Sequence, residues 1–165
     1  MRKFRSVLAQ SIAITAALVI TATTAGPAMA SGHSLVREPL QGIAGANDPV
    51  NPTQPIAGVT AGGAQWVVDE GSRVRLREDG RITVVVNGLI IPGRGNPVPL
   101  MAASLVCGDM VVDSTRSFAV SPDGNGSLTD RIGEFDEDDC DNPIVLVRNA
   151  TGPTLGSYFA FAQDD

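Results

Sequence analysis

Histidine carries much of hydrolytic and zinc chemistry, and this chain has a single histidine, His33. It lies in a stretch rich in glycine and proline near the N-terminus. A Ser-His-Asp or Cys-His system needs an imidazole that is held rigidly against its nucleophile, and such a stretch offers little rigid support. The sequence therefore disfavours histidine-dependent hydrolysis and histidine-ligated zinc. We expect no catalytic residues, no cofactor and no enzyme activity.

Carboxylates are concentrated in one run, with six in the eight positions from Glu134 to Asp141. Because Ca²⁺ takes about 6–8 oxygen ligands, Asp136, Asp138 and Asp139 are weak candidates for calcium ligands. The alternative is a solvated acidic loop that Cys140 holds at one end. Neighbouring carboxylates in a loop also lack the fixed separation that a glycosidase needs, so the run does not predict catalysis.

A second calcium pattern overlaps this run. Asp123, Asn125, Ser127 and Glu134 stand at positions 1, 3, 5 and 12 of an EF-hand-like loop. The pattern fails at position 6, where Leu128 replaces the glycine that the loop needs, and no flanking helix is predicted. A strand explains this segment better than a calcium loop.

Arginine alternates with valine and leucine in one short run, which places Arg73, Arg75 and Arg77 on one face of a strand. Guanidinium groups bind carboxylates and phosphate-like groups, so this row is a candidate interaction surface. The alternative is a solvated sheet face. Ile91 and Arg94 form a second candidate surface, because an apolar strand end runs there into a loop rich in glycine and proline.

The chain has two cysteines, Cys107 and Cys140. In an oxidising compartment one intrachain disulfide is the expected state. It would close a loop of 34 residues and stabilise the fold by about 3–4 kcal/mol in the chain-entropy model. A metal pair and a redox couple are the alternatives. Both are disfavoured because C-x-x-C spacing and a nearby histidine are missing from the sequence.

From Gln65 onward, short runs of Val, Ile and Leu alternate with turn residues every 8–12 positions or so. This rhythm predicts an all-β domain over residues 65–165, an immunoglobulin-like antiparallel β-sandwich of about 7–9 strands with one disulfide. We expect Trp66 to pack against the closing run Tyr158–Phe161. The expected strands are 65–69, 72–77, 81–91, 99–107, 109–114, 116–120, 127–132, 143–148 and 157–162.

The first predicted hairpin can be assigned a register. A two-residue turn at Asp79-Gly80 would set Leu76 against a polar residue. A three-residue loop, Glu78-Asp79-Gly80, instead pairs Leu76 with Ile82 and Val74 with Val84. Because register follows the buried face, we predict the longer loop, with Gly80 at positive φ.

The N-terminal 64 residues are expected to lie outside the sandwich. Residues 1–30 have basic residues at the start, an apolar stretch and a closing Ala28-Met-Ala30, the pattern of a cleaved signal peptide. An uncleaved anchor is the alternative, but the apolar stretch is shorter than the roughly 20 residues that a span needs. Residues 31–64 are predicted to be a flexible leader, because prolines interrupt them repeatedly.

Charge narrows the class of partner. From Ser31 onward the chain has nine arginines and 18 acidic residues, a net charge of about −9. Such a chain repels nucleic acid and anionic membranes, so protein or envelope components are the expected partners of a secreted protein without a span in its mature part. Two Asn-x-Ser/Thr triplets, at Asn125 and Asn149, are glycosylation acceptors only in a source that glycosylates secreted proteins.

Several segments resemble those of an uncharacterised family of small secreted actinobacterial β-sandwich proteins, over about residues 65–162. They are Trp66, the run Val74–Gly80, Asn96–Pro99, and Ala103–Cys107 together with Cys140. The resemblance implies export, the sandwich and the disulfide, and it implies no site.

A looser resemblance is to the neocarzinostatin-type apoproteins, immunoglobulin-like carriers of apolar ligands. It rests on the turn Asp123–Ser127, the strand that follows, a cysteine and the closing Phe159-Ala-Phe161. Those carriers hold two disulfides, whereas this chain has cysteines for one. Two hypotheses follow. The first is a secreted, non-enzymatic interaction module that binds through sheet or loop surfaces, and the alternative is an extracellular carrier of a small apolar ligand beside residues 89–101.

Overall fold

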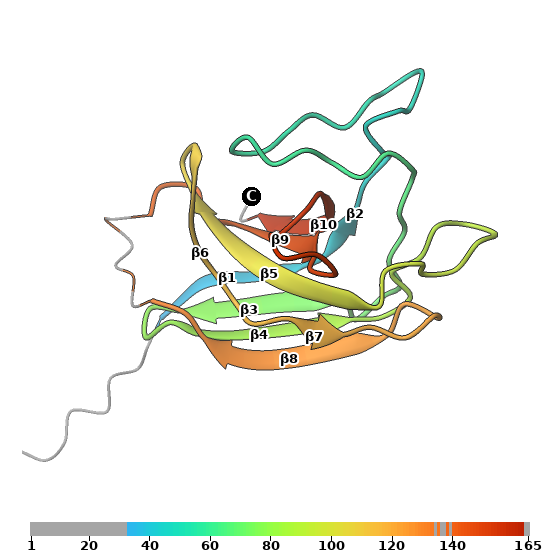
Figure 1. The fold of residues 1–165 in the computed structure, drawn as a ribbon. Coiled ribbons are helices and arrows are strands. Elements are labelled where there is room, and N and C mark those ends of the chain that lie inside the picture. Colours follow the sequence, from blue (N-terminus) through green and yellow to red (C-terminus); the bar gives the residue numbers. More distant parts are fainter. Residues whose placement is uncertain (1–32, 134, 136–137, 139, 164–165) are drawn as a thin grey trace, which may run out of the picture. The chain divides into compact units, whose positions relative to one another are not determined.

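Alternating apolar residues build two antiparallel sheets that pack face to face (Figure 1). The computed structural model describes residues 33–133, 135, 138 and 140–163. The four-stranded sheet has the order β1 (Ser34–Pro39), β3 (Arg73–Arg77), β4 (Arg81–Val86) and β8 (Gly126–Arg131). The six-stranded sheet has the order β2 (Gln41–Gly42), β10 (Tyr158–Gln163), β9 (Ile144–Asn149), β5 (Leu100–Cys107) and β6 (Met110–Ser114), and β7 (Phe118–Ala119) pairs with β5. The predicted class, an all-β sandwich, is confirmed.

The core lies between the sheets and is built by strand alternation. Val74 and Leu76 point inward from β3, and their neighbours Arg73 and Arg75 point to solvent. Leu105 on β5 is fully buried in the same cluster. Burial of one such side chain stabilises a fold by about 1.5–3 kcal/mol, so the inward row fixes which face of each strand carries arginine.

The predicted register of the first hairpin is confirmed. Leu76 pairs with Ile82 and Val74 with Val84, and three residues connect the two strands. Gly80 has a φ of 76°. A Cβ at this position would collide with the backbone carbonyls of Ile132 and Gly133, so glycine is required both for its conformation and for the close approach.

Most of the other predicted strands are confirmed to within a few residues, with two exceptions. Residues 65–69 form no strand and make one isolated bridge, Val67 to Ile90. The predicted strand 81–91 ends at Val86, because the chain leaves the sheet at Asn87 and Gly88, where Gly88 has a φ of 58°.

The predicted flexible leader is wrong over its described residues. Residues 34–39 form β1, which pairs with β3, and Val36 is fully buried. Pro39 ends this strand at the edge of the sheet, where a residue without an N–H is tolerated. The sandwich therefore includes β1 and does not begin at Gln65. The predicted signal peptide, residues 1–30, lies outside the described residues, and the described part of the chain contains no helix that could cross a membrane.

The rest of the supposed leader runs over the outer face of the six-stranded sheet, seen as the teal loops above β9 and β10 in Figure 1. The hydroxyl of Tyr158 donates to the carbonyl of Gln54 at 2.6 Å, and Gly62 N donates to the carbonyl of Tyr158 at 2.8 Å. Trp66 stacks on Phe159 with ring centroids 4.2 Å apart. The expected contact of Trp66 with the closing strand is thus confirmed.

One disulfide supports the interior of the six-stranded sheet. The disulfide Cys107–Cys140 is confirmed, and it joins the end of β5 to the segment that leads into β9, within one sheet. It therefore differs from the disulfide of antibody domains, which connects the two sheets.

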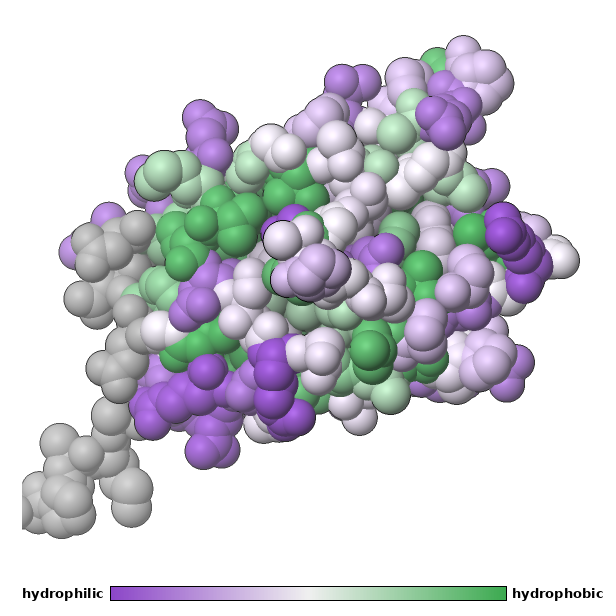
Figure 2. Space-filling model, in the orientation of Figure 1, coloured by the Kyte–Doolittle hydropathy of each residue, from purple (hydrophilic) through white to green (hydrophobic). Residues whose placement is uncertain are grey.

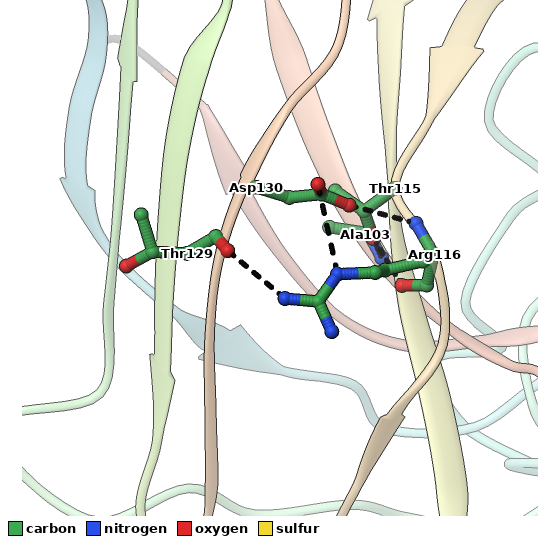
Figure 3. A network of polar contacts seen from close by, with 5 residues as sticks. All are labelled: Ala103, Thr115, Arg116, Thr129 and Asp130. Atoms are coloured by element: carbon green, nitrogen blue, oxygen red, sulfur yellow. Dashed lines mark hydrogen bonds and ion pairs between the residues drawn. The ribbon is translucent and has the colours of Figure 1, made fainter.

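A polar network connects the two sheets through the segment between β6 and β7 (Figure 3). The backbone N–H of Arg116 donates to Asp130 on β8 at 2.9 Å, and its guanidinium lies 3.7 Å from the same carboxylate. Thr115, one residue earlier, receives the N–H of Ala103 on β5 at 3.0 Å. The segment between β6 and β7 is therefore bonded to both sheets.

Candidate functional site

Arginines gather on the outer face of the four-stranded sheet. Strand alternation directs them outward, because their neighbours in sequence fill the core. Figure 2 shows hydrophilic side chains over the end of this sheet where β3 meets β4. Six of the nine arginines that follow Ser31 belong to these strands: Arg37, Arg73, Arg75, Arg77, Arg81 and Arg131.

The end of this face near the β3–β4 loop is already neutralised. The Nε of Arg77 lies 3.7 Å from the carboxylate of Asp79. The Nε of Arg131 donates to the backbone carbonyl of Asp79 at 2.9 Å. The sequence predicts Arg73, Arg75 and Arg77 as one row, but the structure gives Arg77 a partner within its own hairpin and so separates it from the other two.

Arg37 takes the place of Arg77 in the cluster. It lies on β1 directly opposite Arg75 of β3, a position in which two Cβ atoms are about 4.5–5.5 Å apart. Arg73 lies two residues from Arg75, or about 6.6 Å along the strand. These three residues, here termed the arginine triad, line a groove of about 370 Å³ together with Glu38, Pro39 and Ser72.

The triad concentrates positive charge with little compensation. Arg75 Nε donates to the hydroxyl of Ser34 at 3.2 Å and Arg73 Nη1 to the carbonyl of Gly71 at 3.0 Å, and both acceptors are neutral. No ion pair joins any of the three arginines to a residue within the described part of the chain. Glu38 is the single acidic residue of the groove lining. Like charges directly opposite in a sheet are destabilising, so a bound anion would stabilise this arrangement.

The second predicted surface lies elsewhere. Ile91 and Arg94 belong to a tight turn in which Ile91 N donates to the carbonyl of Gly95 at 3.0 Å. Arg94 is exposed. Neither residue lines the groove of the arginine triad, so the structure does not bring the two predicted surfaces together.

The calcium candidates gain no support. Asp136 and Asp139 lie outside the described residues, and Asp138 is exposed. Among the residues that are described, no three His, Cys, Asp or Glu side chains form a group that could hold a metal ion. The EF-hand-like pattern is replaced by a turn and a strand: Asn125 accepts the N–H of Gly88 at 3.0 Å, and Ser127 belongs to β8.

His33 makes no site within the described residues. Its side chain is exposed, and its backbone carbonyl accepts the N–H of Glu78 at 3.2 Å.

Sequence reasoning missed a second cleft, on the outer face of the six-stranded sheet. Arg148 of β9 lies half-buried there and donates to the carbonyls of Gly156 and Leu155, both at 2.9 Å, and to the hydroxyl of Ser104 at 3.3 Å. Burial lowers the pKa of its guanidinium. The cleft beside it has a volume of about 420 Å³. The available signal was a charged residue at the end of the apolar run Ile144–Val147.

Known proteins offer no guide to either site. No protein-family model, no curated protein and no solved structure matches this chain. The resemblances to secreted actinobacterial proteins and to neocarzinostatin-type apoproteins therefore stay predictions.

Proposed function

We propose that this chain is a secreted, non-enzymatic binding module whose arginine triad binds an anionic polymer of the cell envelope. The observation that carries the proposal is the groove itself, in which Arg37, Arg73 and Arg75 lie together and pair with no carboxylate of the described residues. Arg77 and Arg116, by contrast, each form an ion pair within the chain.

The chemistry of the triad favours carboxylate or phosphate groups. Guanidinium presents a planar set of donors that bonds such groups through two parallel hydrogen bonds. The donors are repeated about every 6.6 Å along β3 and also across the β1–β3 pair. A repeating anion laid along the groove can therefore contact several arginines at once, which multiplies a weak single contact.

The charge of the whole chain limits the kind of polymer. The net charge of about −9 from Ser31 onward opposes long-range attraction of any polyanion. Binding then depends on close contact with the groove and on release of counterions. Densely charged nucleic acid is disfavoured for this reason, and a more sparsely charged glycan or phosphodiester polymer is favoured.

The carrier alternative has no observation in its favour. That hypothesis puts the ligand beside residues 89–101, and neither of the two clefts described above is lined by a residue of that segment.

Titration calorimetry with polygalacturonate, a polymer with one carboxylate per sugar, tests the proposal, with neutral dextran as the control polymer. Three arginine contacts predict a slope of about −2 in a plot of log K against log salt, at roughly −0.7 per contact on a flexible strand. Affinity should thus fall on the order of tenfold between 50 and 200 mM salt. The substitution Arg75→Ala should weaken binding and reduce the slope by about one contact.

Arg94→Ala is the matched control, because it removes an exposed arginine outside the groove. It should leave affinity and slope unchanged. If Arg75→Ala and Arg94→Ala lost the same affinity, polymer binding would depend only on the net charge of the chain. If dextran also bound, binding would not depend on charge. Either result overturns the role of the triad.

A further inference from the structure

The cleft beside Arg148 has the composition of a site for a small molecule. It lies on the outer face of the six-stranded sheet, away from the arginine triad, which is on the outer face of the other sheet. Its volume of about 420 Å³ falls within the range of roughly 300–1,000 Å³ that ligand pockets occupy. Apolar walls come from Ala57, Val111 and Leu155, and hydroxyls come from Thr60 and Ser157.

Arg148 has unused donors at this cleft. A guanidinium carries five N–H groups. Three of them donate to Gly156, Leu155 and Ser104, one each from Nε, Nη2 and Nη1. One N–H on each terminal nitrogen therefore has no acceptor among the described residues. Terminal guanidinium nitrogens are among the donors with which arginine binds a carboxylate.

The charge of Arg148 is also uncompensated. All three of its acceptors are neutral, and no described residue forms an ion pair with it. A half-buried cation that bonds only to neutral oxygens has lost hydration without gaining a counter-charge. An anionic group in the cleft would supply that counter-charge.

The hydroxyls narrow the class of ligand. Thr60 Oγ1 and Ser157 Oγ lie 3.2 Å apart and bond to each other. Each hydroxyl has one donor and two acceptor positions, so the pair keeps both kinds of capacity after that bond. They suit hydroxyl groups on a ligand whose carboxylate faces Arg148.

We propose that this cleft is a second binding site, selective for a small hydroxylated carboxylic acid of the sugar-acid class. The carboxylate pairs with Arg148, and the ligand hydroxyls bond to Thr60 and Ser157. The apolar side chains of Val111 and Leu155 pack on the ring or chain of the ligand. This site does not depend on polymer binding by the arginine triad.

Nuclear magnetic resonance of the ¹⁵N-labelled full chain tests the site, with sodium galacturonate as the probe. Methyl galactoside supplies the same hydroxyls without the carboxylate, and inorganic phosphate supplies charge without the hydroxyls. We expect saturable shifts of the Arg148 Nε–H and the Val111 amide with galacturonate, and no saturation with the other two probes.

The variant Val111→Glu places a carboxylate in the cleft and should weaken galacturonate binding by at least about tenfold, because like charge is then brought near the ligand. Val112→Glu is its matched control, since Val112 is the next residue of β6 and is 42% exposed on the opposite side of the strand. It should leave binding unchanged. Arg148→Lys keeps the positive charge but removes the planar set of guanidinium donors, and it should also weaken galacturonate binding.

Absence of saturation with galacturonate in the wild-type chain overturns the proposal. So does equal binding of methyl galactoside or of phosphate, because the class of ligand would then be wrong. If Val111→Glu lost its fold, unchanged galacturonate binding by Arg148→Lys would still count against the site.

Discussion

Thr115 offers a direct test of how the network in Figure 3 holds the sandwich together. Its side-chain oxygen accepts the N–H of Ala103 at 3.0 Å and donates to the carbonyl of Arg116 at 2.8 Å. Thr115 and Ala103 are 7% and 1% exposed, so water cannot readily replace the threonine. The substitution Thr115→Val keeps the shape of the side chain and leaves the N–H of Ala103 buried without an acceptor.

An unsatisfied buried donor costs about 1–3 kcal/mol, so we expect Thr115→Val to lower the free energy of unfolding by about 2 kcal/mol. With a urea m-value of about 2 kcal/mol/M, the unfolding midpoint should fall by roughly 1 M. Equilibrium urea denaturation with the disulfide intact measures this shift. Thr115→Ser keeps the hydroxyl and loses one methyl group, which should cost only about 0.8 kcal/mol.

Thr129→Val is the matched control, because it makes the same chemical change at an exposed hydroxyl that lies 3.4 Å from Thr83. Surface changes of this kind usually stay within about 0.5 kcal/mol. If Thr115→Val were as stable as Thr129→Val, the bond to Ala103 would contribute nothing measurable, and the account of the network would be refuted.

Two further predictions concern the disulfide and Tyr158. Replacing Cys107 and Cys140 together by alanine should lower the free energy of unfolding by about 3–4 kcal/mol, because the unfolded chain is then no longer cross-linked between two residues 33 positions apart. Calorimetry under oxidising conditions measures this change. A loss below about 1 kcal/mol would contradict the prediction. Tyr158→Phe removes the bond to Gln54 and should cost about 1 kcal/mol at neutral pH. Burial raises the pKa of Tyr158, so its contribution is present below the ordinary tyrosine pKa of about 10 and is lost as pH rises through the folded pKa. The stability difference between wild type and Tyr158→Phe should therefore shrink above pH 10 or so, and a difference independent of pH would show that Tyr158 titrates normally.

The predictions that succeeded rest on local rules. The register of the hairpin from Val74 to Val84 follows from its own sequence, because only the three-residue loop pairs Leu76 with Ile82. The arginine positions on β3 follow from the same alternation. The disulfide could also be predicted, since a chain with two cysteines has one possible intrachain pairing.

The predictions that failed have a common physical cause. A segment without local periodicity is ordered by contacts with residues far away in the sequence, and a local pattern does not predict these contacts. Residues 43–64 contain many glycines and prolines, yet Gly62 and Thr60 bond to the backbone of Tyr158 almost a hundred residues later. Proline at position 39 argues against a central strand, but β1 lies at a sheet edge, where proline is tolerated. Assigning this region to a leader also removed Arg37 from the candidate site. Arg148 was missed because its burial depends on the turn at Leu155–Gly156, which no strand pattern predicts.

The two arginine sites should respond differently to salt, and that difference separates them in one experiment. Arg37, Arg73 and Arg75 are exposed or line an open groove, so their attraction to a polymer is screened within a Debye length of about 10 Å at 0.1 M salt. Arg148 is half-buried and donates three hydrogen bonds within the chain. Salt screens the charge of such a buried group much less. Raising salt to about 0.5 M should therefore release the polymer and leave the small acid bound. Loss of both ligands at the same salt concentration would mean that they share one exposed site, and the assignment of Arg148 to a separate cleft would have to be abandoned.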